Sequence, residues 1–79
     1  MSCLRPLADL AENESARVVR LDTGSRLLQR FTDLGLIEGT RVRCLHRRHG
    51  MAAYLIRGAV IAVRQTDCTG ILTVSEAMS

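Results

Sequence analysis

The side chains in this sequence that could bind a metal ion lie close together near its centre. His46 and His49 are separated by two residues, and Cys44 comes two residues before His46. Imidazole and thiolate groups are ligands for borderline transition metals, so His46 and His49 form a candidate site for zinc or ferrous iron. We expect any such binding to be weak, because two ligands do not complete a site and Cys44 is expected to point into the core.

Arginines supply the candidate sites for a partner. All 11 basic residues are Arg, and the formal net charge is +3. A guanidinium group suits bidentate contacts with carboxylates or phosphates. We expect partner binding at Arg26 and Arg30 on the outer face of a predicted helix, or at Arg41 and Arg43 on the outer face of a predicted strand. The alternative interpretation of both sets is an ordinary solvated face.

An RNA-binding small barrel is the alternative function. Arg47 and Arg48 would extend the strand arginines into a basic strip of the kind that small barrels use for nucleic acids. Base stacking has little support, however, because Phe31 is expected in the core and Tyr54 is the only other aromatic residue. The 8 acidic residues are spread along the chain, so no dense basic region is present and DNA binding is not expected.

Residues for catalysis are not brought together by any sequence pattern. We find no carboxylate pair, no Ser or Cys nucleophile next to a His, and no glycine-rich phosphate loop. The six glycines all fall at the ends of predicted elements. We therefore expect a protein that is not an enzyme and that has no cofactor, apart from the weak transition metal considered above.

Length and cysteine content limit the organisation of the chain. The 79 residues are enough for one domain, 1–79, with a folded core at about 4–76. Cys3, Cys44 and Cys68 are odd in number and lack a C-x-x-C pair, which is typical of reduced thiols in the cytoplasm. We find no export signal and no apolar run near the ~20 residues that span a bilayer. The expected location is cytoplasmic.

The elements that would position these side chains follow from periodicity. Alternating and apolar runs predict five strands, and a short helical turn is expected before the first strand and another before the last. The run 59–64 is apolar on both faces, which is typical of a central strand. We expect the sheet to close into a small barrel, because closure removes exposed edges. The predicted strands are 15–21, 40–46, 52–57, 59–64 and 71–74.

One amphipathic helix is predicted after the first strand, at about 25–34. Its apolar residues recur at helical spacing, with Phe31 near the middle of the stripe. Ser25 is the expected N-cap. Gly35 is expected to take the left-handed conformation that ends a helix, with Leu36 folding back onto the last turn. The stripe consists of Leu27, Leu28, Phe31 and Leu34.

Two segments of the sequence resemble a known family. The run Arg-Phe-Thr-Asp-Leu-Gly-Leu-Ile-Glu-Gly-Thr-Arg-Val at 30–42 is similar to a helix that ends in Leu-Gly-Leu and is followed by a Gly-Thr turn into a strand. The run Tyr-Leu-Ile-Arg-Gly-Ala-Val-Ile-Ala-Val-Arg at 54–64, followed by Asp67 and Ile71, is similar to a hairpin closed at Arg-Gly. Both patterns are those of the FeoA family.

The resemblance implies an SH3-like barrel that assists ferrous iron transport in the cytoplasm. The implied partner is FeoB, a membrane transporter with a cytoplasmic G-protein domain, which would recruit this protein to the inner face of the membrane. Similar domains form the C-terminal part of metal-dependent repressors, but we find no DNA-binding domain and expect no repressor role. Family members often carry Pro and Gly/Asp in the loop after the second strand, whereas residues 47–52 here read Arg-Arg-His-Gly-Met-Ala.

Overall fold

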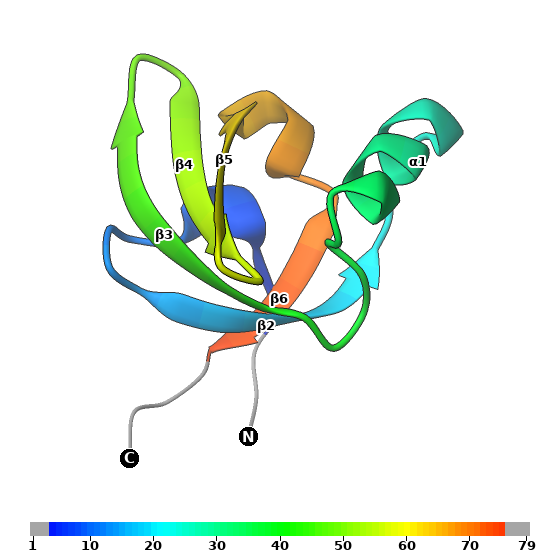
Figure 1. Cartoon of the computed structure of the whole chain (residues 1–79), viewed down its shortest axis with the longest axis horizontal. Helices are drawn as coiled ribbons and strands as arrows, with labels where there is room; N and C mark the ends of the chain where they lie inside the picture. The colour runs from blue at the N-terminus through cyan, green and yellow to red at the C-terminus, as the bar shows by residue number, and fades with distance from the viewer. Residues whose placement is uncertain (1–3, 76–79) are drawn as a thin grey trace.

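The computed structural model describes residues 4–75, which form a small antiparallel barrel with one α-helix at its side (Figure 1). The mainly β prediction, with a helix after the first long strand, is confirmed. The predicted core extends to Glu76, and that residue and Cys3 lie outside the described residues. The elements are β1 (Arg5–Pro6), η1 (Leu7–Asp9), β2 (Ser15–Leu21), α1 (Ser25–Asp33), β3 (Arg41–Arg48), β4 (Met51–Ile56), β5 (Ala59–Arg64), η2 (Gln65–Cys68) and β6 (Ile71–Ser75).

The described part of the chain has six strands rather than the five predicted. The additional strand, β1, has only two residues, and one of them is Pro6. Proline lacks the N–H that a central strand needs, so it is found mainly on edge strands. Arg5 pairs with Thr73, and the Thr73 hydroxyl donates a hydrogen bond to the Arg5 carbonyl at 2.9 Å. The pairing with β6, which is distant in sequence, could not be inferred from so short a run.

The strand order is β1-β6-β2-β3-β4-β5, so β1 and β5 are the edges of the sheet. Two details of the prediction are therefore wrong, although the strands do form the expected small barrel. Strand 59–64 is not central, since it pairs only with β4 and its Val60 is 63% exposed. The sheet is also not closed by hydrogen bonds, because no register joins β1 to β5 within residues 4–75. The two 3-10 helices contact each other, with η1 against β6 and η2 against β5, and so cover the opening.

The inward faces of β2, β3 and β4 build the core. Val18, Val42 and Cys44 are fully buried, as the alternation in β2 and β3 predicts. Tyr54 on β4 is 1% exposed, and its hydroxyl donates a hydrogen bond to the Leu7 carbonyl at 3.1 Å. This bond satisfies a polar group that would be costly to bury without a partner. It also ties η1 to the centre of the barrel.

Helix α1 lies between the end of β2 and the start of β3 (Figure 1). Its N-cap is Gly24, so the prediction of Ser25 as N-cap is wrong; Ser25 is the first helical residue. Phe31 is 2% exposed and belongs to the core, whereas Leu28 is 38% exposed. Leu27 and Leu34 pack against the core from the same stripe.

The helix ends as predicted, with Gly35 in the left-handed region at φ +89°. The Leu36 amide donates to the Phe31 carbonyl at 2.9 Å, and the Gly35 amide donates to the Thr32 carbonyl at 3.0 Å. These two bonds define a Schellman motif, which satisfies carbonyls at the helix end. The motif turns the chain towards β3 and buries Leu36 in the core.

Two-residue turns join β3 to β4 and β4 to β5. His49 and Gly50 have φ of 55° and 77°, and Arg57 and Gly58 have φ of 52° and 83°. Positive φ at both central residues is the requirement of a type I′ turn, whose twist matches that of a hairpin. The segment 47–52, which was expected to be a loop, is therefore mostly strand, with a turn of two residues.

Candidate functional site

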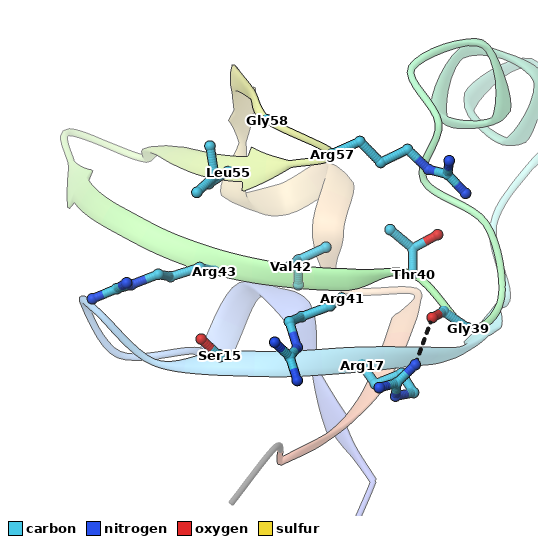
Figure 2. A pocket seen from close by; sticks show the side chains of 10 residues that line it. All are labelled: Ser15, Arg17, Gly39, Thr40, Arg41, Val42, Arg43, Leu55, Arg57 and Gly58. Carbon is cyan, nitrogen blue, oxygen red and sulfur yellow. Dashed lines mark hydrogen bonds between the residues drawn. The ribbon is translucent and has the colours of Figure 1, made fainter. Parts of the chain in front are cut away.

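An open groove of about 610 Å³ lies on the outer face of the barrel (Figure 2). Its walls come from β2, β3, the end of β4 and the β4–β5 turn. Four arginines from these elements line it, and none of the described residues that line it is acidic. The arginines are Arg17, Arg41, Arg43 and Arg57.

The alternation of β3 places two of the predicted partner-binding residues in this groove. Val42 and Cys44 occupy the inward face of the strand, so Arg41 and Arg43 point outward and are exposed. Arg17 on β2 lies directly opposite Arg41 in the register, and its Nη1 donates to the Gly39 carbonyl at 3.0 Å. This pairing concentrates positive charge on the outer face of the two strands.

Arg57 is a groove residue that the sequence analysis did not identify. Its side chain lies over Gly35 at the end of α1, where a Cβ added to the glycine would be 3.1 Å from Cδ of Arg57. The C-terminal end of a helix carries partial negative charge, which favours a cation there. The sequence did show the Arg-Gly turn that contains Arg57. It did not show that this turn lies beside the end of α1, because that contact forms only in the folded chain.

Arg43 and Arg57 have donors available for a ligand. No hydrogen bond or salt bridge joins either guanidinium group to an acceptor among residues 4–75. Figure 2 shows the two side chains at opposite ends of the groove, with Arg41 between them. The arrangement can bind an elongated anion through several charge-assisted hydrogen bonds.

Arg47 has a different environment from the groove arginines. Its Nη1 donates to the Leu10 carbonyl at 3.0 Å, and its amide donates to Oε2 of Glu12 at 3.1 Å. The Gln65 amide oxygen, in the orientation that satisfies both side chains, accepts from Nε and Nη2 of Arg47 at 2.8 Å. Arg47 thus ties β3 to the segments around η1 and η2, and the strip expected to run from Arg41 to Arg48 is interrupted.

The other two predicted partner-binding residues, Arg26 and Arg30, lie on α1 and do not line this groove. Both are exposed. Arg30 contributes to a smaller cavity of about 290 Å³ between α1 and the β5–η2 segment, together with Leu27 and Phe31. The two predicted arginine sets therefore belong to separate surfaces.

No third ligand joins the predicted metal ligands among the described residues. His46 is exposed on β3, and His49 is exposed in the β3–β4 turn, whereas Cys44 is fully buried. Among residues 4–75, no group of three or more His, Cys, Asp or Glu side chains could hold a metal ion. Weak binding of zinc or ferrous iron at the two histidines stays a prediction, which calorimetric titration of each metal would test.

The thiols among the described residues are poor nucleophiles. Cys44 and Cys68 are both fully buried and free. Burial raises the pKa of Cys44, and burial raises the pKa of Cys68 to about 11. Both thiols are therefore protonated near neutral pH, while nucleophilic catalysis requires the thiolate.

Comparison with known families settles the relationship of this chain. The model of the FeoA domain matches residues 5–73. The chain belongs to the FeoA family. FeoA domains are associated with ferrous iron transport, as the resemblance implied. A search of curated proteins found no match.

Solved structures share the fold. A FeoA-like protein from Clostridium acetobutylicum matches with a TM-score of 0.87 and 17% identity, over 100% of this chain and 94% of that one. An iron uptake regulatory protein (FeoA) matches with a TM-score of 0.81 and 19% identity, over 91% and 97%. A manganese-dependent transcriptional repressor in complex with manganese matches with a TM-score of 0.85 and 27% identity, over 91% of this chain but 36% of the repressor. The expected SH3-like barrel of a FeoA domain is thus confirmed.

Helix length gives one further observation about this FeoA domain. No helix among residues 4–75 is long and apolar enough to cross a membrane.

Proposed function

We propose that this FeoA-domain protein is a non-enzymatic accessory protein of bacterial ferrous iron transport that acts by binding the transporter FeoB. It works in the cytoplasm and reaches the inner face of the membrane through that partner. The observation that carries the proposal is the family match over residues 5–73. A family associated with iron transport, combined with a fold of one small barrel, supports a role in controlling or docking to a transporter.

A binding role agrees with the chemistry of the described residues. The groove has arginine donors, and none of the described residues that line it is an acid that could serve as a general base. The two described cysteines are buried and protonated near neutral pH. Charged groups on a surface add little to stability, but they influence the association rate and the choice of partner.

We place the docking surface at the groove, and specifically at Arg41 and Arg43. Both are exposed on β3, a strand that pairs with β2 and with β4, so the sheet sets their backbone positions. The second candidate surface is the outer face of α1 with Arg26 and Arg30. Each of the two predicted pairs consists of exposed arginines, so reversing the charges of either pair changes the net charge equally.

Co-purification with FeoB tests the proposal. The double variant Arg41→Glu/Arg43→Glu should lose binding to full-length FeoB, whereas Arg26→Glu/Arg30→Glu, which changes the net charge equally, should retain it. In cells that lack this protein, radiolabelled ferrous iron uptake should fall, and it should recover with the wild type but not with the first variant. Wild-type uptake in the uncomplemented cells would overturn the proposal.

The alternative RNA-binding function has less support from the side chains. Tyr54 and Phe31, the only aromatic residues in the chain, are 1% and 2% exposed. Neither ring can stack on a base at the surface.

A further inference from the structure

We infer that the arginine-lined groove receives an extended, acidic segment of a partner protein, with carboxylates at alternate positions. The identity of the partner rests on the proposed function, but the chemistry of the groove does not. The inference concerns the kind of chain segment that the groove recognises.

The first argument is charge complementarity. Four arginines from three parts of the fold line the groove without an acidic neighbour among the described residues that line it. The guanidinium groups of Arg43 and Arg57 have no acceptor among residues 4–75. Each can therefore form a bidentate pair with a carboxylate without first breaking a bond to the described part of the barrel.

The second argument is the repeat of the charges. Arg41 and Arg43 lie on the same face of β3, two residues apart, so their Cα atoms are separated by about 7 Å. An extended segment with an acidic side chain at every second residue has the same repeat of about 7 Å. Arg57 follows β4 on the opposite wall of the groove, and its side chain extends towards the end of α1, so it can bind a further acidic group there (Figure 2).

The third argument is that the partner must contact side chains rather than the backbone. β3 is hydrogen-bonded to β2 through Ser15–Arg17 and to β4 through Leu55 and Ile56. No strand can be added between these elements, so strand addition cannot provide recognition in the groove. The guanidinium groups are then the main donors that the groove offers.

A polypeptide fits these observations better than a nucleic acid. The described lining of the groove contains no aromatic residue, and the net charge of the chain is only +3. Binding of single-stranded RNA usually combines a basic groove with aromatic rings on which bases stack. The groove offers only the first of these features.

Fluorescence anisotropy with labelled ten-residue peptides tests the inference. One peptide alternates Glu with Ser, and its matched control alternates Gln with Ser. We expect the Glu peptide alone to bind the wild type, with an affinity that falls as salt is raised. Arg43→Gln/Arg57→Gln should bind it at least about tenfold more weakly. The control variant Arg20→Gln/Arg48→Gln removes two exposed arginines outside the groove. It should bind the Glu peptide within about twofold of the wild type. Melting curves should show that all variants are folded.

Three results would overturn the inference. The first is equal binding of the Gln peptide, and the second is an equal loss in the Arg20→Gln/Arg48→Gln variant, which would indicate net charge rather than the groove. The third is tighter binding of a ten-nucleotide oligouridylate through the same Arg43 and Arg57.

If FeoB is retained by the wild type while the Glu peptide does not bind, the inference fails and the proposed function stands. If the Glu peptide binds through Arg43 and Arg57 but FeoB is not retained, the proposed function fails and the groove chemistry stands.

Discussion

The two ends of β3 use arginine in opposite ways. At its start, Arg43 is exposed in the groove without an acceptor among residues 4–75. Four residues later, Arg47 donates to the Leu10 carbonyl and to the Gln65 side chain. The same residue type on the same strand thus offers a binding group at one end and ties the fold together at the other. The role of an arginine on this strand therefore depends on whether hydrogen-bond acceptors of the fold lie within reach of its guanidinium group.

The cause of this difference is a β-bulge. Positions 43 and 47 of a regular strand would share a face, because side chains alternate with a period of two. The register of β3 against β4 shifts between Cys44 and His46, which leaves Leu45 as the additional residue. One extra residue moves the following side chains to the other face. Arg47 can therefore reach η1 and η2 while Arg43 stays on the groove side.

The largest loss of stability is expected from a change in the core that supports both ends of β3. Phe31→Ala should lower the free energy of unfolding by about 3–5 kcal/mol, because it deletes a buried ring. Leu28→Ala on the same helix should cost less than about 1 kcal/mol, since Leu28 is 38% exposed. Urea unfolding of both variants measures the difference. Equal losses would show that α1 does not cover the core as described.

The next test separates the two arginines directly. Arg47→Met should lower the free energy of unfolding by about 1–3 kcal/mol, because the Leu10 carbonyl and the Gln65 amide lose their donor. Arg43→Met is the same substitution at the groove and should change stability by no more than about 0.5 kcal/mol. Denaturant titrations of the two variants test the contrast. If Arg43→Met were the more damaging change, the assignment of roles along β3 would be wrong.

A smaller effect is expected at the glycine beneath Arg57. Gly35→Ala should destabilise the protein by about 1–2 kcal/mol, because Ala resists the left-handed region. Gly50→Ala is the control, since Gly50 also has a positive φ, of 77°, has nothing within 4 Å of an added Cβ, and does not line the groove. Both variants should lose stability in thermal melts. Only Gly35→Ala should also weaken binding of the Glu peptide, because its Cβ displaces Arg57; identical peptide affinities in the two variants would contradict this.

The smallest effect concerns the salt bridge of Arg5 with Glu14 at the end of the sheet. The hydrogen bond from Arg5, followed by that from the Ala11 amide, holds the pKa of Glu14 below its ordinary value of 4.5. A carboxyl whose pKa is lower in the folded state stabilises the fold above the unfolded pKa, and it loses this contribution as pH falls through the folded pKa.

Glu14→Gln should therefore cost less than about 1 kcal/mol near neutral pH, because the pair is partly exposed. The difference from the wild type should shrink as the pH falls below 4.5 and through the lowered pKa of Glu14. Unfolding free energies across this range provide the measurement. A difference that grows as the pH falls would have the wrong sign for a lowered pKa.

Local patterns in the sequence predicted most of the elements. The run 15–21, the hairpin strand 59–64 and the positive φ of Gly35 all follow from alternation and turn residues, and the structure confirms them. The position of β5 at the edge was not predicted, because an apolar run looks the same whether a strand has one neighbour or two. The pairing of β1 was missed for a related reason, since its partner β6 is more than sixty residues away.

The candidate site was only half predictable. Outward positions on β3 could be assigned from alternation, so Arg41 and Arg43 were identified. Arg57 was not, because only the folded chain brings a hairpin turn over the end of α1. The bulge at Leu45 also leaves no clear signal in the sequence, and it is the reason why Arg47 departs from the expected basic strip.

The antiparallel pairing of β1 with β6 has a consequence for how this domain combines with others. Because Arg5 lies beside Thr73, the chain enters and leaves the barrel at one place. Such a domain can be fused at either end, or inserted into a host protein, without stretching its own strands. The same fold matches 94% of a FeoA-like protein but only 36% of a manganese-dependent repressor, and adjacent chain ends suit both arrangements. The groove arginines come from β2, β3 and the β4–β5 turn, so a fusion made through β1 or β6 leaves their elements intact.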